Sequence, residues 1–333
     1  MINFGIIGAG WRSEFYLRIA SLVPEKFNIT GIYIRNELKK AEFKNKYNVK
    51  ICNNLDELIK TKPEFVVSCV NKDGICDMIC ELCEKGIAVL SETPIGTTPM
   101  QIEGFKKKIK PEWKVQVAEQ FHFQPRNQAI KAIIDSGILG EINQVQLSCC
   151  HDYHAASLIR FFLDVKDEIP KITSFSFPDK LNVMGGRNGT FEKAEERLSQ
   201  QKIAVLEYKN KSAIYDFTSE QYFSDIRHSR IIIRGTNGEI INNTCTYLDG
   251  VTPVTFDLKR NFCGKNESLD GLYLDSITGN GKILYKNPFY KARLTDEEIA
   301  IATCLLKMKD YLLTGTQFYS LYDAITDVKT SLF

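Results

Sequence analysis

Residues 4–13 read Phe-Gly-Ile-Ile-Gly-Ala-Gly-Trp-Arg-Ser, and this stretch decides the fold of the chain. An apolar run ends in glycines and passes into an amphipathic stretch over 11–22, which predicts a strand that turns directly into a helix. Gly8 permits the tight turn, and Gly10 lets the backbone approach a pyrophosphate at the helix N-terminus. Ser13 replaces the usual third glycine with another small residue. The stretch predicts a dinucleotide-binding turn; the alternative is a turn that binds no phosphate.

The first third of the chain alternates between strand and helix patterns. Asn54 and Thr98 have the spacing of residues that cap helices, each with Glu or Gln three positions later. Helical segments between strands predict a parallel sheet with right-handed crossovers. Besides the first strand, the predicted strands cover 29–34, 65–70, 87–90 and 113–118.

The pattern changes after residue 120, where strand-like runs follow one another closely. Clustered strands predict an antiparallel or mixed sheet. We therefore predict two domains, 1–120 and 121–333, with final helices from Thr295 to Gly315 and over 320–332 that pack back toward the first domain. The sequence Met-Gly-Gly-Arg-Asn-Gly at 184–189 indicates a loop. The predicted strands of this part are 141–149, 171–177, 203–208, 212–217, 229–234 and 239–242.

The composition excludes several classes of protein. Of the 333 residues, 44% are hydrophobic and 25% are charged, with a net charge of +2, which predicts neither a nucleic-acid nor a membrane partner. The ten cysteines have no framework spacing, and the first residues lack a secretory pattern, so we expect reduced thiols and a cytoplasmic location. Cys76, Cys80 and Cys83 share one helical face, which favours a buried core over an iron–sulfur site.

Four stretches occur in an order that resembles one known family. They are 65–71 (Phe-Val-Val-Ser-Cys-Val-Asn), 84–94 (Glu-Lys-Gly-Ile-Ala-Val-Leu-Ser-Glu-Thr-Pro), 118–125 (Ala-Glu-Gln-Phe-His-Phe-Gln-Pro) and 133–142 (Ile-Ile-Asp-Ser-Gly-Ile-Leu-Gly-Glu-Ile). The chain resembles the Gfo/Idh/MocA (glucose–fructose oxidoreductase / inositol dehydrogenase) family. The resemblance implies an α/β fold: an N-terminal Rossmann dinucleotide-binding domain and a C-terminal α/β domain with an open, mostly antiparallel sheet. It also implies a homodimer or homotetramer formed through that sheet.

The predicted cofactor is NADP, with NAD possible. The end of the second strand carries Arg35 and Asn36, where NAD enzymes keep an acid for the ribose 2′-hydroxyl. A guanidinium there suits a 2′-phosphate; the alternative is a solvated arginine that begins the next helix. The glycine turn and the resemblance together assign cofactor-binding roles to Gly8, Ala9, Gly10, Trp11, Arg12, Arg35, Asn36, Asn71 and Glu92.

The resemblance also assigns the catalytic residues, with two departures. Thr93 occupies the position of the family's Glu-Lys-Pro lysine, and Cys150 that of an aspartate four residues before the catalytic histidine. His154 falls on that histidine, and an ordinary pKa near ~6.5 suits general acid/base catalysis. Tyr153 and Lys72 are candidates to replace the missing cation, and His122 to contact substrate. The alternative for His154 is a partly buried structural residue.

These observations predict a hydride-transferring oxidoreductase that acts on a sugar-like, cyclitol or other small carbinol or carbonyl substrate. The alternative is a non-redox family member that keeps the dinucleotide as a sensor, regulator or structural cofactor. No metal is predicted, because alternate side chains around His151 point to opposite faces of an extended segment. Arg160 either meets an anionic substrate or pairs with Asp164.

Overall fold

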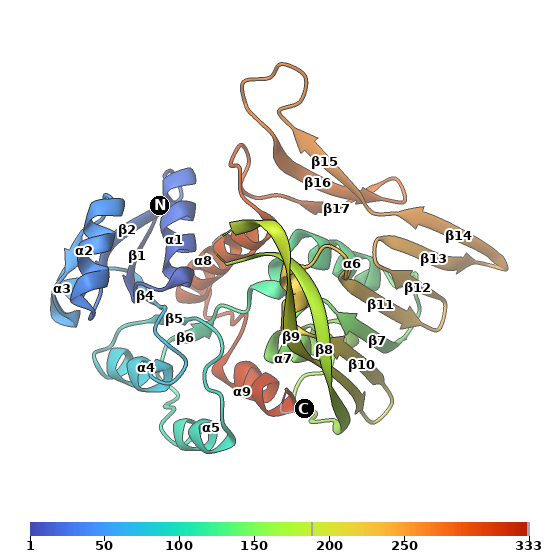
Figure 1. Ribbon diagram of the computed structural model, residues 1–333, viewed down its shortest axis with the longest axis horizontal. Coiled ribbons are helices and arrows are strands. Elements are labelled where there is room, and N and C mark those ends of the chain that lie inside the picture. Colours follow the sequence, from blue (N-terminus) through green and yellow to red (C-terminus); the bar gives the residue numbers. More distant parts are fainter. Residues whose placement is uncertain (188, 332–333) are drawn as a thin grey trace. The chain divides into compact units, whose positions relative to one another are not determined.

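The computed structural model describes residues 1–187 and 189–331 (Figure 1). The chain forms two compact units. The first comprises residues 1–125, 261–275 and 287–325, and the second comprises 126–260, 276–286 and the residues from 326 onward. The sequence predicted a boundary between two independently folding domains at residues 120 and 121. That boundary stays a prediction.

The first unit contains a six-stranded parallel sheet in the order β3-β2-β1-β4-β5-β6. This is the strand order of the doubly wound dinucleotide-binding fold, so the predicted Rossmann domain is confirmed. The strands are β1 (Ile2–Ile7), β2 (Phe27–Tyr33), β3 (Ile51–Cys52), β4 (Phe65–Ser68), β5 (Val89–Ser91) and β6 (Val115–Val117). The helices among them are α1 (Trp11–Leu22), α2 (Glu37–Lys46), α3 (Leu55–Lys60), α4 (Ile75–Glu84) and α5 (Pro99–Lys106).

The middle of this sheet is apolar on both faces, as parallel strands covered by helices require. Phe4 and Ile6 of β1 are completely buried, and the ring of Phe4 stacks on that of Phe65 in β4 with centroids 5.8 Å apart. Cys76 and Cys80 lie buried on α4, where burial raises the pKa of both thiols. The cysteine face of this helix is therefore part of the core.

A helix from the far end of the sequence completes the first unit. It is α8 (Asp296–Thr314), and it begins at the predicted Thr295, which forms a capping box with Glu298. It ends at Gly315 in a left-handed conformation. On its first turn, Glu297 accepts a 2.8 Å hydrogen bond from Arg12 of α1. The short helix η1 (Gln120–Phe123) also belongs to this unit.

The second unit is built on an eight-stranded sheet in the order β14-β13-β12-β11-β7-β10-β9-β8. Only the β7–β10 pairing among the recorded pairs is parallel, so the predicted mostly antiparallel sheet is confirmed. The strands are β7 (Ile142–Ser148), β8 (Lys171–Gly186), β9 (Gly189–Glu207), β10 (Ser212–Phe217), β11 (Arg230–Gly235), β12 (Gly238–Ile241), β13 (Thr244–Asp249) and β14 (Thr252–Asp257). The helices are α6 (Pro125–Asp135), α7 (Asp152–Leu163) and η2 (Ser219–Phe223).

Three further strands form a small separate sheet, and one helix ends the described chain. The strands are β15 (Lys259–Cys263), β16 (Tyr273–Gly279) and β17 (Lys282–Lys286), in that spatial order. The helix is α9 (Leu321–Thr330). The predicted final helix extended to residue 332, which lies outside the described residues.

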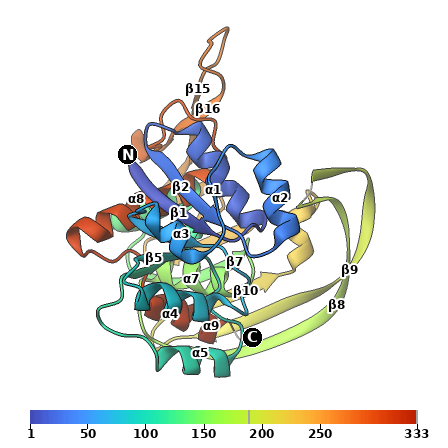
Figure 2. The same cartoon turned by 90° about the vertical axis from the view of Figure 1, so that its left-hand side faces the viewer.

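The prediction of a loop over 184–189 is wrong for residues 184–186. These residues end β8, and Gly189 begins β9, so the two strands form one long curved hairpin (Figure 2). Residue 188 lies outside the description. Most of this hairpin is exposed and rich in charged residues, so it lacks the apolar alternation by which a strand is predicted.

None of the helices in the described part of the chain is long and apolar enough to cross a membrane.

Candidate functional site

The turn after β1 requires glycine at its first position. Gly8 has a φ of +113°, and a Cβ placed there would lie 2.4 Å from the carbonyl oxygen of Cys69. The backbone N–H of Gly8 donates to the carbonyl oxygen of Tyr33 over 3.0 Å. Beyond β4, the N–H of Cys69 donates to the carbonyl oxygen of Ile7 over 2.8 Å. The turn is thus fixed between the carboxyl ends of β1, β2 and β4, where ligands bind in this fold.

The second glycine faces open space. A Cβ on Gly10 would meet no atom within 4 Å, and no side chain caps the first turn of α1 at this residue. The N–H groups of a helix's first turn point out of its N-terminus, and a phosphate is well suited to accept hydrogen bonds from them. Ser13, at the third-glycine position, is fully buried, and its hydroxyl donates to the carbonyl oxygen of Gly8 over 3.0 Å. This arrangement can hold a pyrophosphate.

Arg12 and Glu92 form part of an internal network of the first unit. The Arg12 guanidinium donates to Glu297, lies 3.4 Å from Glu92, and stacks over the Trp11 ring at 4.6 Å from its centroid. Glu92 is buried and also accepts a hydrogen bond from Tyr16. Burial raises the pKa of Glu92, although the positive charge of Arg12 opposes the shift. Ala9 is half-buried and Trp11 is 39% exposed at the turn.

A second carboxyl group is buried in the same unit. Glu119 precedes η1, is 1% exposed, and accepts a 3.2 Å hydrogen bond from the N–H of Phe121. Burial raises the pKa of Glu119 to about 8, although that hydrogen bond and the charge of Arg12 act in the opposite direction. Near neutral pH the group is therefore largely protonated. No pattern in the sequence indicated this buried acid beyond its place in the 118–125 stretch.

The end of β2 has no acid at the ribose position. Arg35 is exposed there, and the side chain of Asn36 caps α2 by accepting from the N–H of Lys39 over 3.0 Å. The next carboxylate along the chain, Glu37, pairs with Lys40 at 3.0 Å. The exposed groups at this strand end are therefore a guanidinium and an amide.

The remaining predicted residues of the first unit lie on its loops. Asn71 is exposed, and its side-chain oxygen accepts from the N–H of Gly74 over 3.1 Å, just before α4. Lys72 is its exposed neighbour. Thr93 is half-buried and joined to Pro94 by a cis peptide bond. His122 lies in η1, half-buried, with its ring edge-on to that of Tyr319 at 5.0 Å.

The second unit brings together two histidines and a tyrosine at the start of α7. The ring centroid of His154 lies 4.3 Å from that of Tyr153 and 5.1 Å from that of His151. His154 is only 3% exposed, while Tyr153 and His151 are half-buried. Cys150, at the family's aspartate position, is fully buried. We call His151, Tyr153 and His154 the histidine cluster.

Two tyrosines that the sequence did not indicate support this cluster. The backbone N–H of His151 donates to the Tyr222 hydroxyl over 3.0 Å, and Nδ1 of the same histidine lies 2.8 Å from that hydroxyl. The N–H of Asp152 donates to the Tyr215 hydroxyl over 3.2 Å, and the Asp152 carboxylate pairs with Lys202 at 3.0 Å. Both tyrosines lie more than sixty positions away along the chain, so no local pattern could identify them.

The protonation of His151 follows from these contacts. Burial, together with the neighbouring His154, lowers the pKa of His151 to about 4. The ring is therefore neutral at pH 7. The Tyr222 hydroxyl holds Nδ1 of this neutral ring, and the tautomer of the imidazole sets which of the two donates.

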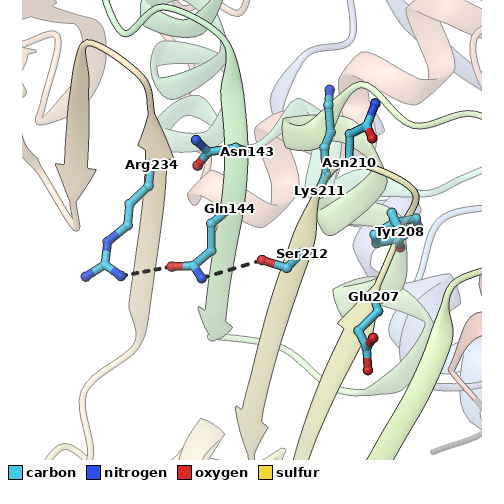
Figure 3. Close-up of a pocket in the computed structure, with 8 residues that line it drawn as sticks. All are labelled: Asn143, Gln144, Glu207, Tyr208, Asn210, Lys211, Ser212 and Arg234. Atoms are coloured by element: carbon cyan, nitrogen blue, oxygen red, sulfur yellow. Dashed lines mark hydrogen bonds between the residues drawn. The ribbon is translucent and has the colours of Figure 1, made fainter.

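A separate cavity of about 470 Å³ lies over β7, β10 and β11 (Figure 3). A row of hydrogen bonds crosses it, from Arg234 to Gln144 over 2.8 Å and from Gln144 to Ser212 over 3.5 Å. The residues lining it are polar and differ from those of the histidine cluster. Among residues 1–187 and 189–331, no group of three or more His, Cys, Asp or Glu side chains could hold a metal ion.

The fold and the glycine turn define a two-domain protein of the dinucleotide-binding class. Comparison with protein families agrees: residues 2–134 match the family model GFO_IDH_MocA, described as an oxidoreductase family with an NAD-binding Rossmann fold. The N-terminal domain therefore matches the Gfo/Idh/MocA family of oxidoreductases. A search of curated protein sequences gives no match.

Solved structures of this kind resemble the chain over nearly its whole length. An oxidoreductase from Agrobacterium radiobacter in complex with NAD+, L-tartaric acid and magnesium is 13% identical, with a TM-score of 0.68; 99% of this chain and 94% of that chain are covered. A myo-inositol dehydrogenase from Corynebacterium glutamicum is 15% identical, with a TM-score of 0.61 and coverages of 99% and 94%. A Synechocystis biliverdin reductase in complex with biliverdin and NADP+ is 14% identical, with a TM-score of 0.61 and coverages of 99% and 96%. At these identities the likeness shows the fold alone.

Proposed function

We propose that the protein is an NADP-preferring oxidoreductase. It transfers a hydride between the nicotinamide and a sugar-like, cyclitol or other small carbinol or carbonyl compound. One observation carries the proposal: Gly8 and Gly10 form an open turn before α1, in a sheet with the dinucleotide-binding strand order. The known structures of this fold include complexes with NAD+ and with NADP+. Exposed Arg35, with no acid beside it before α2, favours the 2′-phosphate of NADP.

The chemistry needs a group that moves the hydroxyl proton, while the bound nicotinamide supplies or accepts the hydride. His154 has this role in the proposal, with Tyr153 and Thr93 as hydrogen-bonding partners of the substrate oxygen. Thr93 carries no charge, and the loss of one electrostatic group of this kind can cost on the order of 10²–10³ in rate. His151, neutral and fixed by Tyr222, places no second positive charge beside His154.

Calorimetric titration with NADP and NAD tests the cofactor assignment. We expect the wild-type protein to bind NADP at least about 10-fold more tightly than NAD, because a guanidinium–phosphate pair stabilises the complex by roughly 1.5–3 kcal/mol. Arg35→Ala should remove this preference and leave NAD affinity unchanged. Lys44→Ala, an exposed cation on α2, is the matched control and should keep the preference. Failure to bind either dinucleotide would refute the proposal.

Turnover tests the chemistry. NADP(H) absorbance is followed with a panel of polyols, cyclitols and sugars and their oxidised forms, and His154→Ala should abolish any activity found. The second candidate is a non-redox dinucleotide-binding protein, which Thr93 and buried Cys150 favour because they replace a lysine and an aspartate of the family pattern. Hydride transfer with any substrate rejects this candidate. Tight binding without transfer, unchanged by His154→Ala, supports it.

The assembly and location stay proposals. The open face of the eight-stranded sheet, with its polar row from Arg234 to Ser212, supports a homodimer or homotetramer formed through that face. Light scattering on the purified protein measures the assembly. A cytoplasmic location accords with the ten cysteines, which are all free thiols.

A further inference from the structure

A basic cavity of about 320 Å³ lies in the second unit, separate from the cavity of Figure 3. We call it the Arg126 pocket. Its polar lining includes Arg126, Arg260, His228, Asn242 and Asn243, and none of the described residues that line it is acidic. His228, Asn243 and Arg260 are exposed at its rim, whereas Arg126 is half-buried. Two guanidinium groups and side-chain amides around one hollow make it complementary to negative charge.

Arg126 has an unused donor inside this pocket. It is the second residue of α6, and its Nη2 donates to the side-chain oxygen of Asn242 over 3.4 Å. Its Nε is buried and has no hydrogen-bond acceptor among the described residues. Burial lowers the pKa of Arg126, and the charge of Arg260 lowers it further, although the neighbouring Cys149 opposes both. A buried cationic donor without an acceptor is unfavourable, so the site is incomplete as it stands.

Asn242 cannot compensate for this deficit. Its side-chain oxygen already accepts a 3.0 Å hydrogen bond from the N–H of Ile231, and its φ of 58° holds the residue in a left-handed turn after β12. The contact with Arg126 is therefore a long, shared one. Even with the contact to Asn242, Nε of Arg126 has no acceptor among the described residues.

The pocket lies near the carboxyl end of β7, and the histidine cluster follows β7 in the chain. His228 precedes β11, whose first residue, Arg230, pairs with Ser148 at the carboxyl end of β7. Buried Gln221 joins the two segments, because its amide donates to the carbonyl oxygens of Ser148 over 2.8 Å and of His228 over 3.2 Å. The chain runs from β7 through Cys149 and Cys150 into His151. The Arg126 pocket and the histidine cluster thus share the carboxyl end of β7.

We propose that the Arg126 pocket binds an oxyanion, the carboxylate or phosphate group of a small molecule. A guanidinium presents paired N–H groups that match either group, and the unused Nε of Arg126 completes such a pair. The anion has two possible sources: an acidic substituent on the substrate, or a free inorganic anion that acts as a ligand in its own right. Only the first source rests on the proposed function.

The full chain is titrated calorimetrically at low salt with inorganic phosphate and with malonate. Arg126→Gln should weaken binding at least about 10-fold, since a charged hydrogen-bonded contact is lost. Arg126→Lys keeps the positive charge but removes the Nε donor, so it should weaken anion binding less than Arg126→Gln does. Asn243→Asp places a negative charge at the exposed rim and should also weaken binding about 10-fold. Arg234→Gln, a cation elsewhere on the sheet, is the control and should bind as wild type.

The proposal is overturned if the wild-type protein binds neither anion, or if Arg126→Gln and Asn243→Asp both bind like wild type. The second result would place the anion elsewhere, for example at the Gly8–Gly10 turn. Should Arg126→Gln fail to fold, Asn243→Asp alone decides, because its side chain is exposed.

The two sources separate in a further measurement. If the anion belongs to the substrate, phosphate competes with an acidic substrate, and Asn243→Asp raises KM with little change in kcat. If it is a free ligand, phosphate does not compete. Dinucleotide affinity should be the same in all these variants. If the wild-type protein binds no dinucleotide but still binds phosphate through Arg126, the proposed function is refuted and the oxyanion site is supported.

Discussion

The hydroxyl of Ser13 donates to the carbonyl oxygen of Gly8 over 3.0 Å and closes the turn from inside helix α1. A third glycine at this position would allow close packing but could not form this bond. We expect Ser13→Ala to lower the free energy of unfolding by about 1 kcal/mol, the usual net contribution of one hydrogen bond. Urea unfolding measures this. Ser21→Ala removes an exposed hydroxyl of the same helix and should have a smaller effect.

The two turn glycines should respond differently to the same substitution. Gly8→Ala places a Cβ against the Cys69 carbonyl at a positive φ, so it should lower both thermal stability and dinucleotide affinity. Gly10→Ala meets no protein atom and has a φ of −88°, so it should leave stability nearly unchanged and weaken dinucleotide binding alone. Calorimetry with and without NADP separates the two effects. Equal stability losses would contradict this account of the turn.

Glu119 should make the protein less stable as pH rises. Its folded-state pKa is about 8, above the ordinary value of 4.5, so between these values the unfolded chain loses this proton while the folded chain keeps it. The contribution is fully present below pH 4.5 and is lost as pH rises toward 8, by up to about 5 kcal/mol. Glu119→Gln should remove this dependence, as measured by urea unfolding at several pH values. An unchanged pH profile would show that Glu119 is ionised in the folded protein.

His151 should act in the opposite direction. Its folded-state pKa is about 4, below the ordinary 6.5, so the unfolded chain takes up a proton first as pH falls. The contribution is present above pH 6.5 and is lost between pH 6.5 and 4, by no more than about 3 kcal/mol. His151→Asn should flatten the profile in this range. NMR titration of the His151 ring gives the pKa directly, and a value near 6.5 would exclude this mechanism.

A buried ion pair should contribute strongly to the second unit. Arg160 donates to Asp327 over 2.6 Å, and both side chains are almost inaccessible to solvent. Asp327→Asn removes the carboxylate that pairs with the buried guanidinium and should lower the free energy of unfolding by about 3–5 kcal/mol. The double variant Arg160→Met/Asp327→Leu should lose less than the single one. Glu196→Gln breaks an exposed pair with Lys180 and should cost under about 1 kcal/mol.

Local signals in the sequence predicted much of the first unit. The glycine turn, the alternation of strands with helices and the caps at Asn54, Thr98 and Thr295 all depend on residues within a few positions of one another. Such features can be predicted from sequence because the residues that determine each one lie within the short segment that adopts it. The full length of the β8–β9 hairpin was harder to predict from the sequence. Exposed strands need no apolar alternation and are stabilised by pairing with each other.

Contacts between distant residues could not be predicted. Arg160 was expected to meet substrate or pair with Asp164, but its partner Asp327 lies 167 positions away. Tyr222 lies 71 positions from His151, and Asn242 lies 116 positions from Arg126. A single chain offers no covariation to connect such pairs. The predicted roles of Arg12 and Glu92 at the cofactor, and of His154 in catalysis, stay predictions that the proposed titrations and variants test.

The pairing of Arg12 with Glu297 and of Arg18 with Glu298 has a consequence for biosynthesis. A ribosome releases the glycine turn and α1 long before it reaches α8, some 280 positions later. At elongation rates of ~5–20 residues per second, the nascent N-terminal segment waits on the order of tens of seconds for the helix that completes it. During that interval Arg12 and Arg18 lack the glutamates of α8, so we expect nascent chains halted before residue 296 to need chaperone protection that the finished protein does not.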